Sequence, residues 1–205
     1  MKIKLYKGNE HLIVFIGEQE TDALIQMGLS QTLLLVQDLD WNAMLSPWPA
    51  QRVFGSGKDF AGQADQTIAF LEETLGSMKQ DYQDITIMGY SLAGLFALYA
   101  CTKTDLFDYC ISASGSLWYP GWLDYLSKHP LYAKRIYLSL GDQEKNTRIA
   151  KMKTVEDCTK KTYELIQNQQ KEVTFYLNSG NHFQDPAGRL YKGIQWIFHK
   201  EAEQA

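Results

Sequence analysis

Ser91 lies in the segment Gly89-Tyr90-Ser91-Leu92-Ala93-Gly94, a G-x-S-x-G pattern between an apolar run and a helical pattern. A serine in a sharp strand-to-helix turn exposes its hydroxyl above the carboxyl edge of a sheet, where it can attack a carbonyl carbon. The glycines suit this turn because a side chain at either place would collide with a neighbouring strand or helix. A serine that only caps the helix is the simpler alternative, but the strand-turn-helix context favours a nucleophile.

A general base must accept the proton of such a serine, and histidine is the usual one. Three of the four histidines follow Ser91 in the chain, namely His129, His182 and His199. His182 comes directly after the last predicted strand, which places it on a loop at the carboxyl edge of the sheet. His129 and His199 fall at predicted helix ends, where a solvated or capping histidine is the better explanation. The sequence therefore predicts His182 as the base.

A carboxylate must orient this base. The predicted strand before Gly141 ends in Gly141-Asp142-Gln143-Glu144, so either acid could reach His182. Glu144 is favoured because it has two further residues of turn and an extra methylene of reach, whereas Asp142 suits a local hydrogen bond to the backbone. Asp142 stays the alternative acid.

Two N–H groups should stabilise the oxyanion of a tetrahedral intermediate. The first is the backbone N–H of Leu92, the residue after the nucleophile. The second should come from the loop after an early strand, where Gly17 and Glu18 are the candidates.

Four tryptophans lie in two irregular segments, residues 38–59 and 114–130. Aromatic side chains on loops near a catalytic edge are suited to line an apolar substrate pocket. Pinning the loops to the core is an equally good explanation for any single tryptophan. We expect at least Trp118 to lie near Ser91, and we take as further pocket candidates Trp41, Trp48 and Trp122.

The elements that must position these residues follow from the apolar pattern. Six continuous apolar runs predict strands buried on both faces, as in a parallel sheet covered by helices, at residues 11–16, 32–36, 84–88, 109–113, 135–140 and 173–177. Residues 2–6 alternate and predict an edge strand. Helical periodicity predicts helices at 64–78, 92–100, 152–166 and 190–198, and a short helix within 114–130. The strand-helix alternation predicts an α/β three-layer sandwich with a mostly parallel central sheet and helices on both faces.

The composition argues against several classes of function. The 205 residues suffice for one domain, and the net charge of −4 argues against binding to nucleic acid or an anionic membrane. The N-terminal residues lack the pattern of a signal peptide, and no stretch is apolar enough to span a bilayer. Three cysteines form no metal-ligand spacing and cannot all pair, so we expect reduced thiols and a cytoplasmic location.

Four motifs resemble those of a known family, and they occur in its order: the elbow at Ser91, Ser-Gly-Ser-Leu-Trp at 114–118, Leu-Ser-Leu-Gly-Asp-Gln-Glu at 138–144, and Gly-Asn-His-Phe at 180–183. The chain resembles the putative-esterase family of α/β hydrolases, which includes siderophore trilactone esterases, feruloyl and acetyl-xylan esterases, S-formylglutathione hydrolases and mycolyltransferases. The resemblance implies the α/β-hydrolase fold. It also implies Glu144 as the acid and the segment around Trp118 as pocket lining. The chain is shorter than typical relatives, which implies a single small domain over 1–205 without a large lid.

Together these features predict a serine carboxylic-ester hydrolase that acts on a small-molecule ester through an acyl-enzyme, with no metal or cofactor. An acyltransferase or thioesterase with the same three residues is the alternative within enzymes. A catalytically silent binding protein on this fold is the alternative outside them, and the complete serine, acid and histidine set argues against it.

Overall fold

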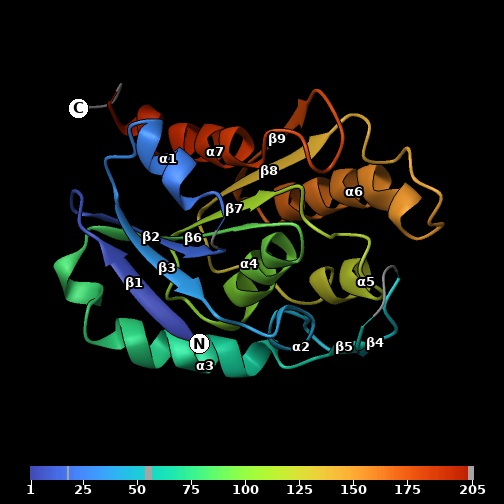
Figure 1. Cartoon of the computed structure of the whole chain (residues 1–205), viewed down its shortest axis with the longest axis horizontal. Coiled ribbons are helices and arrows are strands. Elements are labelled where there is room, and N and C mark those ends of the chain that lie inside the picture. The colour runs from blue at the N-terminus through green and yellow to red at the C-terminus, as the bar shows by residue number, and fades with distance from the viewer. Residues whose placement is uncertain (18, 54–56, 203–205) are drawn as a thin grey trace.

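The structure is a computed structural model that describes residues 1–17, 19–53 and 57–202. Its centre is a seven-stranded sheet (Figure 1) in which β1 is antiparallel to β3 and all other neighbours are parallel. The spatial order of the strands is β1 (Lys2–Tyr6), β3 (Thr32–Gln37), β2 (His11–Ile16), β6 (Asp84–Tyr90), β7 (Tyr109–Ala113), β8 (Arg135–Gly141) and β9 (Glu172–Asn178). Every predicted strand is present, and the predicted edge strand is confirmed as β1. The prediction that residues 173–177 are buried on both faces is wrong, because β9 forms the other edge of the sheet and most of its residues are exposed or half-buried.

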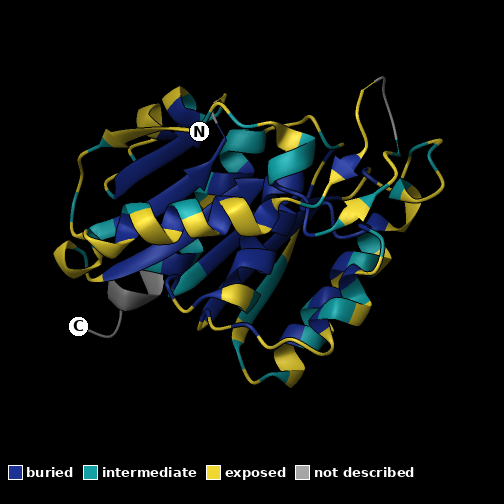
Figure 2. Ribbon diagram, turned by 90° about the horizontal axis from the view of Figure 1, so that it is seen from below, coloured by how far each residue is buried: buried dark blue, intermediate teal, exposed yellow. Residues whose placement is uncertain are grey.

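Helices cover both faces of the sheet. Strand β2 shows why: Leu12, Val14 and Ile16 pack into one core, and Ile13 and Phe15 into the other. The second core is closed by α1 (Thr21–Gln26) and α7 (Pro186–Ala202), and the first by α3 (Ala64–Gly76), α4 (Leu92–Lys103), α5 (Trp122–Leu126) and α6 (Val155–Asn168). Figure 2 shows the central strands buried between helices whose outer faces are exposed. The predicted three-layer α/β sandwich is confirmed.

Short elements were not predictable from periodicity. The segment expected to be a loop at 38–59 contains α2 (Trp41–Met44) and β4 (Pro49–Ala50), and β4 pairs with β5 (Phe60–Ala61). Helix α2 begins where the Asp40 carboxylate accepts a hydrogen bond from the Ala43 N–H, a local cap that has no apolar period. Helix α1 and the 3₁₀ turn η1 (Lys79–Asp81) are similarly short, whereas η2 (Met152–Thr154) leads directly into α6 and forms the start of the helix predicted at 152–166. Within the described ranges, no helix has the length and apolar character that crossing a bilayer requires.

The parallel strands bring their carboxyl ends to one edge of the sheet. The chain passes outward from β2 to β3 and then returns to β6 on the other side of β2, so the direction of winding reverses between β2 and β6. In open α/β sheets, a crevice for ligands lies at such a reversal, outside the carboxyl ends of the strands. The turn after β6 contains Ser91, and the turns after β2, β3, β7, β8 and β9 lie along the same edge.

Candidate active site

The turn between β6 and α4 holds Ser91 in a strained conformation. Its φ of 57° and ψ of −123° lie in a region that costs about 1–3 kcal/mol for a residue with a side chain. The strain is sustained by hydrogen bonds on both sides of the turn: the Ser91 N–H donates to Ala113 O over 3.1 Å, and Ser91 O accepts from the Ser116 and Gly94 N–H groups at 3.0 Å. The serine is thereby fixed at the amino end of α4.

The two glycines of the elbow are required by close packing. A Cβ on Gly89 would collide with the backbone of Ala93 in α4. A Cβ on Gly94 would lie 3.0 Å from Ser112 Oγ and 3.1 Å from Gly115 Cα, at the end of β7. The predicted reason for glycine at these positions is therefore confirmed.

A chain of hydrogen bonds runs from Ser91 through His182 to Glu144. The Ser91 Oγ lies 3.1 Å from His182 Nε2, and His182 Nδ1 lies 2.7 Å from Glu144 Oε2. An ionised carboxylate only accepts, so the Nδ1–H donates to Glu144 and Nε2 keeps the lone pair that can accept the serine proton. The side chain of His182 is 25% exposed and that of Glu144 is 3% exposed, so the acid is shielded while the imidazole faces solvent.

Asp142 has a different partner. Its Oδ1 accepts a hydrogen bond of 2.8 Å from the Gly180 N–H, and its own N–H donates to Asn178 O over 2.8 Å. These two bonds tie the turn after β8 to the loop that leads to His182. The structure thus brings Glu144, and not Asp142, to the imidazole.

The second oxygen of Glu144 is fully occupied. Its Oε1 accepts hydrogen bonds of 2.7 Å from the Gly141 N–H, from Ser114 Oγ and from Arg189 Nη1. Burial acts to raise the pKa of the Glu144 carboxyl, but the hydrogen bonds from His182, Gly141 and Ser114 outweigh it and hold the pKa below its ordinary value. The carboxylate therefore stays ionised, as a group that orients an imidazole must.

Arg189, in the first turns of α7, supports both ends of this arrangement. It is 1% exposed, and besides Glu144 its Nη1 donates to Tyr90 Oη over 3.1 Å. Its Nη2 donates to Asn181 O over 2.8 Å and to Ser179 O over 3.3 Å. The Tyr90 hydroxyl in turn donates to His182 O over 2.7 Å. One buried guanidinium thus holds the Glu144 carboxylate and the loop that contains His182 together.

Sequence reasoning gave no role to Arg189, Tyr90 or Ser114. Buried arginines are rare unless paired, and Arg189 directly precedes the apolar face of α7 that begins at Leu190. A charge at that place was the only signal in the sequence, and it did not identify the partner, which lies 45 residues away in the chain.

The candidates for stabilising an oxyanion differ in their fit. The N–H groups of Gly94 and Leu95 donate to Ser91 O, and these are the first hydrogen bonds of α4. Leu92 precedes them in the first turn of the helix, where a backbone N–H has no partner within the helix. The Gly17 N–H donates to Val36 O over 3.4 Å, along the sheet toward β3. In the structure this N–H takes part in the pairing with β3, and the role of Gly17 as an oxyanion donor stays a prediction. Glu18, the other candidate, lies outside the described residues.

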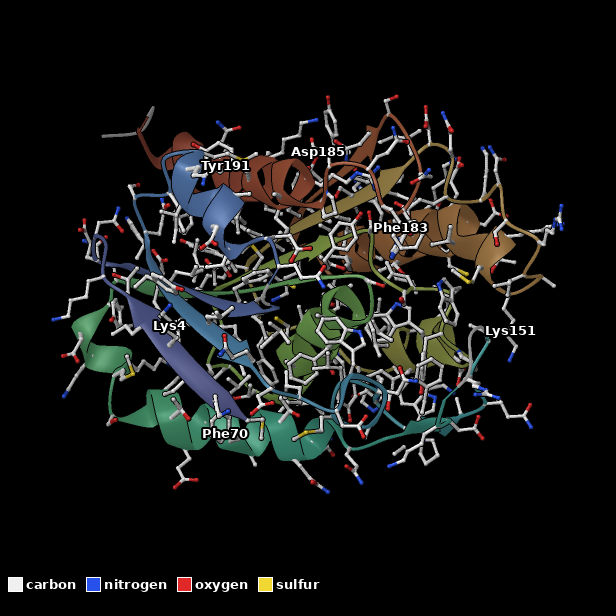
Figure 3. The ribbon with its side chains drawn as sticks, viewed as in Figure 1. Lys4, Phe70, Lys151, Phe183, Asp185 and Tyr191 are labelled. Carbon is white, nitrogen blue, oxygen red and sulfur yellow. The ribbon has the colours of Figure 1, made fainter. Side chains whose placement is uncertain are left out.

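Two cavities border on Ser91. The first has a volume of about 460 Å³ and lies at the carboxyl ends of β2 and β3, where it is lined by Gly17, Glu20, Asp38 and Trp41 among others. The second, of about 350 Å³, is lined by Glu144, His182 and a more apolar set that includes Trp118, Ile149, Met152, Val155 and Phe183. Phe183 is 85% exposed, on the loop between β9 and α7 (Figure 3). Ser91 lines both cavities.

The four tryptophans divide between cavity and core. Trp41, 39% exposed, lines the first cavity, and Trp118 lines the second. The prediction that Trp122 lines the pocket is wrong: its side chain is fully buried and its Nε1–H donates to Thr162 Oγ1. Trp48 lines neither cavity either, because its Nε1–H donates to Pro120 O and its ring packs against Tyr99, Tyr119 and Tyr125. Both fasten the irregular segments to the core.

The remaining histidines lie elsewhere. His129 is exposed at the end of α5, where its Nδ1–H donates to Tyr125 O and its ring stacks on the Tyr125 ring at 3.9 Å. His11 begins β2 at the opposite edge of the sheet, with Nδ1 2.6 Å from Asp84 Oδ2. His199 falls in α7, and its side chain lies outside the described part of the structure. Among the described residues, no group of three or more histidine, cysteine, aspartate or glutamate side chains could hold a metal ion.

A known family resembles this chain in sequence, and solved structures resemble it in fold. A model of the family described as Putative esterase matches residues 38–193. No curated protein matches the chain in sequence. The siderophore hydrolase EstA of Aspergillus nidulans gives a TM-score of 0.65 at 17% identity, over 93% of this chain and 82% of that chain. An enterochelin esterase of Shigella flexneri gives a TM-score of 0.71 at 17% identity over 96% of this chain, which spans only 54% of the esterase.

A more distant neighbour is the acylaminoacyl peptidase of Pyrococcus horikoshii, with a TM-score of 0.61 at 15% identity over 97% of this chain and 39% of that one. At such low identity these structures establish the fold alone, and the predicted α/β-hydrolase fold is confirmed. The family model establishes the family as well as the fold, because it covers more than half of the chain, including the segments with Ser91, Glu144 and His182. The chain therefore belongs to the Putative esterase family, and it is an esterase.

Proposed function

We propose that this esterase cleaves carboxylic esters through an acyl-enzyme on Ser91. Ser91 Oγ attacks the ester carbonyl carbon while His182 Nε2 accepts its proton, and Glu144 stabilises the resulting imidazolium. The Leu92 N–H is one donor to the oxyanion of the tetrahedral intermediate. His182 then returns the proton to the leaving alcohol, and the ester Oγ–C bond of the acyl-enzyme remains.

Water completes the cycle by the same route in reverse. His182 accepts a proton from water, which attacks the acyl carbon, and the proton finally returns to Ser91 Oγ. The observation that carries the proposal is the unbroken hydrogen-bond chain from Ser91 through His182 to Glu144, with distances of 3.1 and 2.7 Å. A catalytically silent binding protein would have no use for a strained serine aimed at an imidazole.

The test is hydrolysis of p-nitrophenyl butyrate, combined with labelling by a fluorophosphonate. Attack by Ser91 Oγ on phosphorus expels fluoride and leaves a stable Oγ–P bond, so the label should appear on the peptide that contains Ser91 and turnover should cease. Peptide mass spectrometry locates the label. Absence of both turnover and labelling in the folded protein would favour the silent binding protein, and labelling at another residue would refute Ser91 as the nucleophile.

A second experiment concerns the acid. Glu144→Gln should lower kcat for this ester by about 10²-fold or more, because the amide cannot stabilise an imidazolium as a carboxylate does. Asp142→Asn should lower it by at most about tenfold, since the Asp142 carboxylate accepts a hydrogen bond from the loop backbone at Gly180 and not from His182. Steady-state kinetics, with folding checked by circular dichroism, measures both. A large loss in Asp142→Asn beside near-normal Glu144→Gln would reverse the assignment.

A further inference from the structure

The first cavity carries charge of one sign beside the candidate nucleophile. Glu20 and Asp38 both line it, and no lysine or arginine is found among the described residues that line either cavity. The exposed Asp38 pairs with Lys2 over 2.9 Å, which offsets its charge. Glu20 is half-buried and makes no salt bridge within the part of the chain that the structure describes. Among the described residues that line this cavity, the Glu20 carboxylate is therefore the charged group that no salt bridge offsets.

The environment of Glu20 favours a cationic ligand. Burial raises the pKa of the Glu20 carboxyl, which means that its ionised form has lost part of its hydration. A positive charge brought into the same cavity offsets that loss, whereas a negative charge adds repulsion in a partly desolvated space. Trp41 lines the same cavity with an exposed indole, and an indole face attracts cations, quaternary ammonium groups in particular.

The position of His182 decides which part of the ester lies in this cavity. This step rests on the proposed function, in which His182 returns a proton to the leaving alcohol. The alcohol oxygen must therefore be within hydrogen-bond reach of His182 Nε2. His182 lines the second cavity and not the first. The alcohol accordingly leaves toward Trp118, Ile149 and Met152, and the acyl group extends from Ser91 into the first cavity.

We propose that the acyl group of the preferred ester carries a positive charge, held in the first cavity by Glu20 and the face of Trp41. The alcohol part is uncharged and apolar, in keeping with the second cavity. With this charge preference, esters whose acyl group is an anion are poor substrates.

The experiment compares three p-nitrophenyl esters of matched size. Their acyl groups are 4-(trimethylammonio)butanoyl, its uncharged carbon isostere 5,5-dimethylhexanoyl, and the anionic 4-sulfobutanoyl. We expect kcat/KM to be about tenfold higher for the cationic than for the neutral ester, and lower again by about tenfold for the anionic one. Equal values for the cationic and neutral esters, or preference for the anion, would overturn the proposal.

Variants assign the preference to Glu20. In Glu20→Gln, the ratio of kcat/KM between the cationic and neutral esters should fall from about ten to about one. The matched control is Asp22→Asn, which removes the same charge from an exposed position on α1 that does not line the cavity, and its ratio should equal that of the wild type. A ratio unchanged by Glu20→Gln, or equally reduced by Asp22→Asn, would refute a specific contact at Glu20.

A fourth and fifth ester locate the charge within the substrate. Butyrylcholine and its carbon isostere 3,3-dimethylbutyl butyrate place the same group on the alcohol. Cation preference in this pair, with none in the acyl series, would show that the acyl and alcohol positions are reversed. Failure of the proposed function would look different, because none of the five esters would then be hydrolysed.

Discussion

Ser91→Ala is expected to lower kcat/KM for p-nitrophenyl butyrate by at least about 10³-fold and to abolish fluorophosphonate labelling. The variant lacks the atom that attacks in the proposed mechanism, while the backbone and both cavities remain, so any residual rate comes from binding and electrostatics alone. Spectrophotometric kinetics measures the rate, and mass spectrometry of the intact protein measures the label. Loss of labelling without loss of turnover would show that Ser91 reacts but does not carry the reaction.

The control for this substitution is Ser77→Ala. Ser77 is exposed at the end of α3 and contacts neither cavity, so its rate should match the wild type within about twofold. The Ser91→Ala protein should also fold, because the hydrogen bonds from the Ser91 N–H to Ala113 O and from the Ser116 N–H to Ser91 O do not involve the hydroxyl. Its circular dichroism spectrum and urea midpoint should therefore stay close to those of the wild type. If the variant did not fold, its loss of rate would not test the role of the Ser91 hydroxyl.

His182→Ala is expected to cost about 10³-fold or more in kcat, because the variant lacks the imidazole that accepts the Ser91 proton in the proposed mechanism. His182 is the one histidine whose described contacts include Ser91. Its side chain is 25% exposed, so the space left by the substitution is open to solvent. Added imidazole should therefore restore part of the lost rate, which a variant impaired only by misfolding would not show.

His129→Ala is the matched control, since it removes the same side chain from an exposed helix end. Its hydrogen bond and its ring contact in the described part of the chain are both with Tyr125, and the rate of the variant should stay near the wild-type value. If His129→Ala were the damaging change and His182→Ala the mild one, the proposed order of serine, acid and histidine along the chain would be refuted.

The elbow and the parallel sheet were predictable from the sequence because both depend on residues close together in the chain. The apolar run of β6, the glycines that meet Ala93 and Gly115, and the apolar helix α4 form one continuous segment. The loop with His182 was predictable for the same reason, since it follows a strand directly. The choice between Glu144 and Asp142 was open in the residues alone, and the reach of the longer side chain agrees with the observed contact to His182.

The other features depend on contacts between distant segments. Trp118 and Trp122 are four residues apart in one irregular segment, yet the first lines a cavity and the second donates a hydrogen bond to Thr162 in the core. No local pattern distinguishes them, because the difference is made by α6, which packs against α5 from elsewhere in the chain. The Gly17 amide is likewise directed by β3, which follows it in the sequence.

The position of Arg189 on α7 has a consequence for how the chain can be divided. A cut after β9, at Asn178, would leave Ser91 and Glu144 on the larger fragment and place His182 and Arg189 together on the smaller one. Neither fragment alone holds both His182 and Glu144. The apolar face of α7 packs on β7 and β8, so the contacts of His182 with Ser91 and Glu144 depend on the docking of the last helix.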